Sequence, residues 1–323
     1  MNPLQQYLFS AISLCLVAII FYQCGSARSV AAVTDYNNRR LILRDEGLSQ
    51  LSYVDLANAK NNWYITVPQG RDLQLVGNGR VLIGTGKGFE EREIATGKKV
   101  FELTSYSGTV SARRLRNGNT LLAGVDWQNK KGVTLVEVDI TGNQQHLVSF
   151  PEFNYVRLVR ETSSRTYLIT AGTTVFEADK KSAILWRAQI TGVEKPNAWQ
   201  AVRLSNGQTI VSGGYAKNFQ VFSGDGSLQT TITGPADVNP NFYAGFQVLP
   251  NGNYVVTNWQ GHGPKFGANG VQLLEYTAGG KLVWSWKQDA EKFSSLQGVI
   301  VLNGLDSNKL HVENSEGVLA PVE

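Results

Sequence analysis

Methionine, cysteine and charged residues are all scarce in this sequence. Only one of its 323 residues is methionine, and 17% are charged. No run of Lys and Arg exceeds two residues, which argues against nucleic acid as a partner. Both cysteines, Cys15 and Cys24, lie before residue 28. The rest of the chain is therefore expected to have no disulfide, no thiol nucleophile and no thiolate metal site.

The first 27 residues carry no charged side chain. Residues 7–22 form an apolar run, which is short for a membrane span and typical of a signal-peptide core. The small residues that follow offer a cleavage site, and Cys24 also permits lipid attachment. We therefore interpret residues 1–27 as a signal peptide, with a lipid or membrane anchor as the alternatives. The sequence predicts an exported protein, periplasmic or extracellular, with one domain over residues 28–323. Only the N-terminal segment would touch a membrane.

Glycine and aromatic residues are plentiful, with 33 Gly, 12 Tyr and 7 Trp. Together with many short β-branched runs, they indicate an all-β fold. An Asn-Gly dipeptide between apolar runs is a strong hairpin signal, because both turn residues favour φ > 0. It recurs along the chain, with one degenerate copy at Ser163-Ser164. The intact copies are at 78–79, 117–118, 206–207, 251–252 and 303–304.

A second hairpin family alternates with the first. Its six copies cover residues 53–63, 91–101, 137–147, 177–186, 220–230 and 274–284. Two interleaved families predict a six-bladed β-propeller with four strands in each blade. Five blades are expected near 72–104, 112–149, 155–190, 199–233 and 244–287. The sixth would be shared between a hairpin in 297–313 and strands in 39–67. Seven blades are the alternative, with residues 30–67 forming a blade alone.

The second hairpin resembles a known repeat. Residues 93–101, with Glu93, Thr96, Gly97, Lys98 and Phe101, are similar to the D-x-x-T-G-K-x-x-W pattern of quinoprotein (PQQ-like) propellers. The LPNGN segment at 249–253, with six blades, also resembles arylsulfotransferase-type propellers. The first resemblance implies that the tryptophan docks onto the neighbouring blade. Quinoprotein dehydrogenases are longer and typically eight-bladed, so we expect no cofactor. The resemblance concerns architecture, because this repeat serves many functions.

Polar residues are expected at the inner mouth of one face of the propeller. There, loops between second and third strands meet the connections between blades, and the first strands line a central channel. The sixth residue before each hairpin asparagine, together with Asn154 in the degenerate blade, would lie at this funnel mouth. Five of these six residues are polar, and the ring is either a wet channel mouth or a ligand site. They are Asp72, Ser111, Asn154, Gln200 and Gln297.

Aromatic residues are expected to rim the same face. Trp127-Gln128 and Trp259-Gln260 occupy equivalent loops three blades apart, so they would face each other across the channel. With Tyr215, they could stack on a flat or sugar-like ligand. The alternative is that each tryptophan caps its own blade.

His262 is the candidate catalytic residue, because it lies between two glycines and its ring suits acid–base chemistry near neutral pH. Arylsulfotransferase-type propellers resemble this chain and imply a histidine nucleophile in the funnel, a role that only His262 could fill. The sequence shows no orienting partner for it, and the alternative is a loop histidine bonded to backbone. No metal site is expected, since Asp72 and Asp126 are too few for calcium.

Three functions follow. The first is an exported, non-catalytic propeller that binds a small molecule, glycan or protein on its funnel face. The second is a transferase or hydrolase that uses His262. The third is a scaffold that docks a protein assembly by its blade edges.

Overall fold

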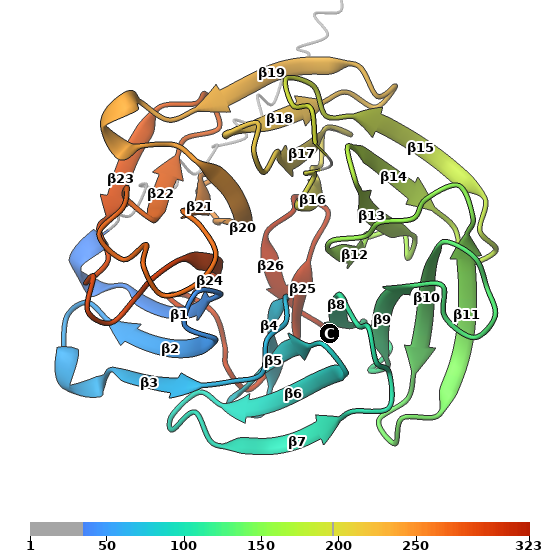
Figure 1. Cartoon of the computed structure of the whole chain (residues 1–323), viewed down its shortest axis with the longest axis horizontal. Helices are drawn as coiled ribbons and strands as arrows, with labels where there is room; N and C mark the ends of the chain where they lie inside the picture. Colours follow the sequence, from blue (N-terminus) through green and yellow to red (C-terminus); the bar gives the residue numbers. More distant parts are fainter. Residues whose placement is uncertain (1–34, 196) are drawn as a thin grey trace, which may run out of the picture. The chain divides into compact units, whose positions relative to one another are not determined.

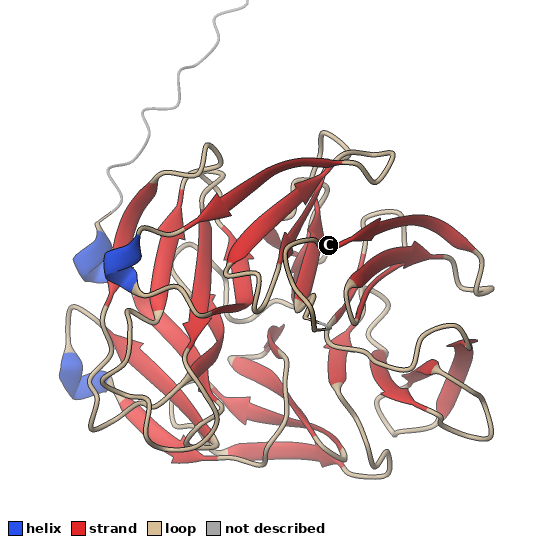
Figure 2. Cartoon of the chain, turned by 45° about the horizontal axis from the view of Figure 1, so that its top comes forward, coloured by secondary structure: helices blue, strands red, loops and turns tan. Residues whose placement is uncertain are grey.

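The structure is a computed structural model that describes residues 35–195 and 197–323. Strands dominate this part of the chain, and its helices are three short 3-10 turns (Figure 2): η1 (Tyr36–Asn38), η2 (Ala59–Asn61) and η3 (Ala236–Val238). No helix in the described ranges is long and apolar enough to cross a membrane. The predicted signal peptide or anchor, residues 1–27 with Cys24, lies outside the described residues.

Six four-stranded antiparallel sheets in the described residues are arranged around a central axis (Figure 1). Their apolar faces pack against one another in a ring, which makes the protein a six-bladed β-propeller, as predicted. Blade 1 consists of β24 (Leu296–Val301), β1 (Arg40–Asp45), β2 (Gln50–Asp55) and β3 (Trp63–Thr66), in that order from the axis outward. Blade 2 is β4 (Leu73–Gly77), β5 (Arg80–Thr85), β6 (Gly88–Glu93) and β7 (Lys99–Leu103).

The remaining blades follow the chain in the same way. Blade 3 is β8 (Ser111–Arg114), β9 (Thr120–Val125), β10 (Val133–Val138) and β11 (Gln144–Phe150). Blade 4 is β12 (Val159–Glu161), β13 (Tyr167–Ala171), β14 (Thr174–Ala178) and β15 (Ile184–Gln189). Blade 5 is β16 (Gln200–Arg203), β17 (Thr209–Ser212), β18 (Asn218–Phe222) and β19 (Leu228–Thr233). Blade 6 is β20 (Phe242–Val248), β21 (Tyr254–Trp259), β22 (Leu273–Tyr276) and β23 (Leu282–Trp286).

The shared blade differs from the prediction in its composition. A C-terminal hairpin was expected to join it, but only β24 does so, pairing with β1 from Leu41↔Val301 to Asp45↔Leu296. The N-terminal part supplies the other three strands, so no place remains for a second C-terminal strand. The seven-blade alternative is wrong for the same reason.

The strands after β24 instead form a separate hairpin, β25 (His311–Glu313) and β26 (Leu319–Pro321), at the centre of the ring (Figure 1). Backbone bridges join it to blade 2 at Val76↔Leu310 and to blade 6 at Val248↔Val318. Gly317 faces blade 5 so closely that a Cβ there would lie 2.5 Å from a methyl of Val202. This hairpin, called the channel hairpin below, therefore fills part of the central channel.

Four of the five repeated Asn-Gly turns take two forms. Only at Asn78-Gly79 do both residues have positive φ, at 52° and 65°. At Asn117, Asn206 and Asn251 only the glycine does, and each asparagine Oδ1 accepts a hydrogen bond from the backbone N–H two residues on, at 3.0 Å. The side chain thus builds an Asx turn in place of a left-handed residue.

Tryptophans of the outer strands dock onto the next blade. Trp63 in β3 donates to the carbonyl of Ile94 at 3.0 Å, and Trp186 in β15 donates to the carbonyl of Ser223 at 3.3 Å. Each indole thus covers the outer hairpin turn of its neighbour. The expected docking of these aromatics is present in both cases.

Candidate functional site

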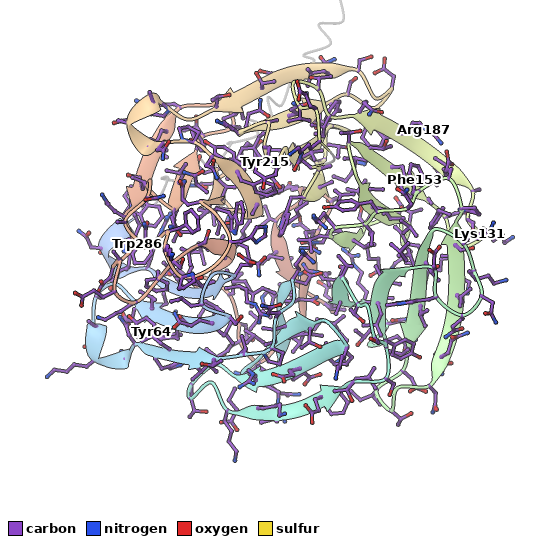
Figure 3. All side chains as sticks on the ribbon, in the orientation of Figure 1. Tyr64, Lys131, Phe153, Arg187, Tyr215 and Trp286 are labelled. Atoms are coloured by element: carbon purple, nitrogen blue, oxygen red, sulfur yellow. The ribbon has the colours of Figure 1, made fainter. Side chains whose placement is uncertain are left out.

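A pocket of about 300 Å³ lies where the interblade connections converge with the loops between second and third strands. Blades 1, 5 and 6 contribute to it, together with the connections that precede blades 2, 4 and 5. Figure 3 shows one lining residue, Tyr215, nearer the axis, whereas Lys131 and Arg187 lie at the outer rim. The lining residues are Glu46, Arg71, Tyr155, Arg157, Lys195, Asn197, Trp199, Tyr215, Phe242, Trp259, His262 and Gln297. We call this the arginine–aromatic pocket.

Aromatic rings form one wall of the pocket. Phe242 lies edge-on between Trp199 and Trp259, with ring centroids 5.3 and 5.4 Å apart. Tyr215 packs on Phe242 at 4.7 Å and is 43% exposed, while both tryptophans are buried. These contacts hold the rings in place before any ligand arrives. The indole N–H of Trp199 is buried and has no hydrogen-bond partner among the described residues.

Two arginines lie against the same wall. The Arg157 guanidinium lies 4.0 Å from the Tyr155 ring centroid and 5.4 Å from that of Trp199. The Arg71 guanidinium lies 5.5 Å from Trp199. Burial lowers the pKa of Arg71. Burial, and secondly the charge of Arg71, lower the pKa of Arg157 to about 9.

Neither guanidinium forms a salt bridge within residues 35–195 and 197–323. The Nε of Arg71 is also buried without a partner there. Both guanidiniums belong to partly buried residues, and a cation withdrawn from water is ordinarily paired, because an uncompensated charge is costly to bury. The pocket thus combines an apolar wall with two guanidiniums that form no salt bridge, although the charge of Glu46 acts on Arg71 from a distance.

His262 has an orienting partner that the sequence did not reveal. Its Nδ1 lies 2.8 Å from Oε1 of Glu46, which belongs to the β1–β2 turn, 216 residues earlier. The other oxygen of Glu46 accepts from Trp259 Nε1 at 3.2 Å. The His262 ring packs edge-on against Trp259 at 4.7 Å, and its side chain is 75% exposed. The carboxylate therefore fixes the ring and leaves Nε2 free of this contact.

Four of the five predicted funnel-mouth residues lie in or beside the channel, and most of their polar atoms are already bonded. Asp72 accepts from Ser111 Oγ at 2.6 Å and pairs with Arg160 at 3.1 Å. Gln200 donates to the Phe246 carbonyl of the next blade at 2.8 Å. Gln297 donates to the Gly70 carbonyl at 2.9 Å and also lines the arginine–aromatic pocket.

Five predicted positions are not among the lining residues of the pocket: the channel residues Asp72, Ser111 and Gln200, and also Asn154 and Trp127. Asn154 is exposed. Trp127 folds back over its own blade, where its Nε1 donates to the Ser107 carbonyl at 3.0 Å and its ring covers Gly124. It packs on Tyr106, with centroids 6.0 Å apart. The expected pairing of Trp127 with Trp259 is therefore absent, and the capping alternative describes Trp127.

Sequence reasoning missed Arg71, Arg157 and Trp199. A weak signal existed, because Arg71 directly precedes Asp72 and Trp199 directly precedes Gln200. Arg71 and Trp199 each lie seven residues before the asparagine of their blade's first hairpin. Glu46 carried no such signal, because its role depends on a contact with a distant blade.

No group of three or more His, Asp or Glu side chains in the described ranges is placed to hold a metal ion. The donors that line the pocket include guanidinium, ammonium and indole N–H groups, which suit an anionic group, and Glu46 is the one carboxylate in the lining. Any cofactor held here would thus be recognised through its acid groups.

Comparison with protein-family models and with curated proteins finds no match. Several solved structures share the fold. A protein of unknown function from Bacteroides caccae is similar with a TM-score of 0.64 and 21% identity, over 81% of this chain and 98% of that one. A streptogramin B lyase matches with a TM-score of 0.55 and 9% identity, over 88% and 94% of the two chains. A chain of a nidogen–laminin complex matches with a TM-score of 0.58 and 8% identity, over 81% and 97%.

These neighbours are propellers, and at such identities the likeness concerns the fold alone. The PQQ-like and arylsulfotransferase resemblances thus stay sequence-based expectations.

Proposed function

We propose that this propeller binds a small organic anion with a flat apolar body in the arginine–aromatic pocket. The observation that carries the proposal is the pair of guanidiniums, Arg71 and Arg157, which lie against Trp199 without any carboxylate partner in the described residues. An anionic group between them would relieve their mutual repulsion and gain charge-assisted hydrogen bonds. The proposal selects one ligand class, a small molecule, from the three that the sequence predicted for the funnel face.

The shape of the wall supports a flat ligand. Tyr215 and Trp259 present ring surfaces around Phe242, and a planar ligand can contact several of them at once. Aromatic pairs contribute about 0.5–1.5 kcal/mol each beyond their buried area. The rings are already fixed by one another, so little side-chain entropy is lost when a ligand enters.

The test compares an aromatic acid with its neutral counterpart. Isothermal titration calorimetry would measure the Kd of 2-naphthoate and 2-naphthamide for the protein. We expect the acid to bind about tenfold or more tightly, because a charged hydrogen bond contributes about 1.5–3 kcal/mol. Arg157→Met should remove that preference. Arg187→Met is the matched control, since Arg187 is an exposed arginine paired with Glu152 at the rim.

Equal affinity for the acid and the amide, or an equal loss in both arginine variants, would contradict the proposal. Failure of both compounds to bind would do so as well.

A second candidate function is a hydrolase or transferase that uses His262, favoured by the 2.8 Å contact between His262 Nδ1 and Glu46. A carboxylate in this position fixes the imidazole orientation, so Nε2 can act as a base or nucleophile toward a group held in the pocket. We expect any turnover of p-nitrophenyl sulfate or acetate to fall at least 100-fold in His262→Gln with an unchanged Tm. Glu46→Gln should retain binding of 2-naphthoate but lower turnover. Turnover that survives His262→Gln would exclude this role.

Export is part of the proposal as well. It rests on the apolar run at residues 7–22 and the small residues after it. N-terminal sequencing of the secreted protein would test it, and an intact N-terminus on protein retained inside the cell would contradict it.

A further inference from the structure

A second cavity, of about 210 Å³, adjoins the arginine–aromatic pocket. Glu46, Arg71 and Gln297 line both spaces, so the two are continuous around these side chains. The second cavity differs in character, because its other walls are polar side chains and backbone, including Ser49 and Arg44. It offers no aromatic surface to a ligand.

Arg44 is the unusual residue of this cavity. It is 1% exposed, and it lies opposite Gly298 on the innermost strand of blade 1. A Cβ at Gly298 would lie 3.3 Å from the Arg44 Cβ, so the glycine leaves room for the arginine side chain beside it. One nitrogen, Nη2, donates to the carbonyl of Pro68 at 2.5 Å. The other two, Nε and Nη1, are buried with no partner among the described residues.

No carboxylate in the described part of the chain forms a salt bridge with Arg44. Burial lowers its pKa to about 10, against an opposing effect of Glu90. That carboxylate is already paired with Arg92, at 2.6 Å. Arg44 is thus a fully buried cation that forms no salt bridge among the described residues, and it lines the second cavity.

Two carboxylates also line the cavity, but their oxygens are already bonded. Asp45 accepts from the backbone N–H groups of Ser294 and Ser295, at 2.6 and 3.1 Å. Glu46 is bonded to His262 and Trp259, as described above. Neither carboxylate forms a salt bridge with Arg44 or Arg71, although the charge of Glu46 opposes the lowering of the Arg71 pKa by burial.

We infer that this cavity is a second anion subsite, and that the ligand of the proposed function carries two acid groups on one flat body. One acid group would bind between Arg157 and Arg71, and the other between Arg71 and Arg44. The inference rests on the proposed function, because Arg71 serves both subsites. It adds that the ligand is a rigid diacid rather than a monoacid.

The test pairs diacids with monoacids of the same ring system. Calorimetry would compare naphthalene-2,6-dicarboxylate with 2-naphthoate, and terephthalate with benzoate. We expect at least one diacid to bind about tenfold or more tightly than its monoacid, because it gains a second set of charged contacts. Replacing Arg44 itself would disturb the Pro68 loop, so a different variant is needed.

Ser49 provides that variant. It lines the second cavity and has a positive φ of 49°, a conformation that Asp and Asn tolerate. Ser49→Asp would place a negative charge beside the cations, and Ser49→Asn is its uncharged match. Ser49→Asp should abolish the diacid preference while changing monoacid affinity less than about threefold, and Ser49→Asn should keep the preference.

Each other result would overturn the inference. Equal binding of diacid and monoacid by the natural protein would leave the proposed function standing and remove the second subsite. A diacid preference that survives Ser49→Asp would place the second acid group elsewhere. If none of the four acids binds, the proposed function fails and this inference fails with it.

Discussion

The propeller contains two sets of buried or partly buried arginines that differ in their partners. In the first set, each guanidinium meets a glutamate of the preceding blade. Three such pairs join neighbouring blades: Arg39–Glu275, Arg114–Glu91 and Arg203–Glu177. In the second set, Arg44, Arg71 and Arg157, no salt bridge forms within the described residues. The first set lies between blades, and the second lines the funnel-face cavities.

The contrast distinguishes arginines that stabilise the fold from arginines that are available to bind a ligand. A paired guanidinium helps to hold two neighbouring blades in register. Its removal would leave the partner carboxylate buried without a counter-charge. An unpaired guanidinium destabilises the free protein and is expected to gain its partner only from a ligand. The arginines of the channel belong with the paired set, because Arg113 and Arg160 form salt bridges there with Asp72 and Glu313.

The largest effect is expected from breaking a paired arginine. Glu275→Ala should lower the free energy of unfolding by about 3–5 kcal/mol, because Arg39 would remain buried and unpaired. Urea unfolding at neutral pH would measure the change. The double variant Arg39→Met, Glu275→Leu should recover most of the loss. A loss as large in the double variant would mean that packing, and not charge, dominates this contact.

A smaller effect is expected in the channel. Burial alone would raise the pKa of Glu313, but Arg113 and Arg160 outweigh it and hold that pKa below its ordinary value. The stability that its ionised form provides is therefore present above about pH 4.3, the ordinary pKa of Glu, and is lost as the pH falls through the lowered pKa.

Glu313→Gln should then cost about 1–3 kcal/mol at pH 7. The difference from the natural protein should shrink below about pH 4.3. Unfolding measured at several pH values would show this convergence. A difference that is constant from pH 7 to pH 3 would contradict the pairing.

The opposite sign is expected for the unpaired set. Arg157→Met should stabilise the ligand-free protein by about 1 kcal/mol, or about 2 °C in Tm, because it removes a buried charge beside Arg71. Arg203→Met, at a paired position, should lower the Tm in the same calorimetric scan. If both variants lower the Tm equally, the two sets do not differ in the way described.

The smallest effect is expected at Trp127. Trp127→Phe removes one hydrogen bond to the Ser107 carbonyl and should cost about 1 kcal/mol of stability. Because Trp127 does not line the pocket, the Kd of 2-naphthoate should stay unchanged. A tenfold weaker affinity for 2-naphthoate would show that Trp127 does contribute to the binding site.

The sequence was informative where the physical signal is local. Hairpin turns depend on neighbouring residues, so the blades and their order could be predicted from the Asn-Gly and outer-hairpin repeats. The shared blade was predicted, but its division was wrong, because the choice between β1 and β25 as the neighbour of β24 depends on distant packing. The turn at Asn303 looked like the others, yet its side chain accepts from Arg40 N and donates to Asn38 O instead.

The site was less predictable for the same reason. His262, Trp259, Tyr215 and Gln297 were chosen by position and do line the pocket. The property that distinguishes the pocket is the lack of partners for Arg71 and Arg157, and a missing contact leaves no trace in a linear pattern. The partner of His262 comes from the other end of the chain.

The pairing of β24 with β1 also determines how the chain can fold. Leu41 lies next to Val301, so the ring closes only through a contact between residues far apart in sequence. During synthesis, β1, β2 and β3 emerge early and must wait as a three-stranded sheet with an open inner edge. Such long-range closure makes folding slow, and exposed strand edges favour association with other chains. The last blade to be completed is thus the first one made.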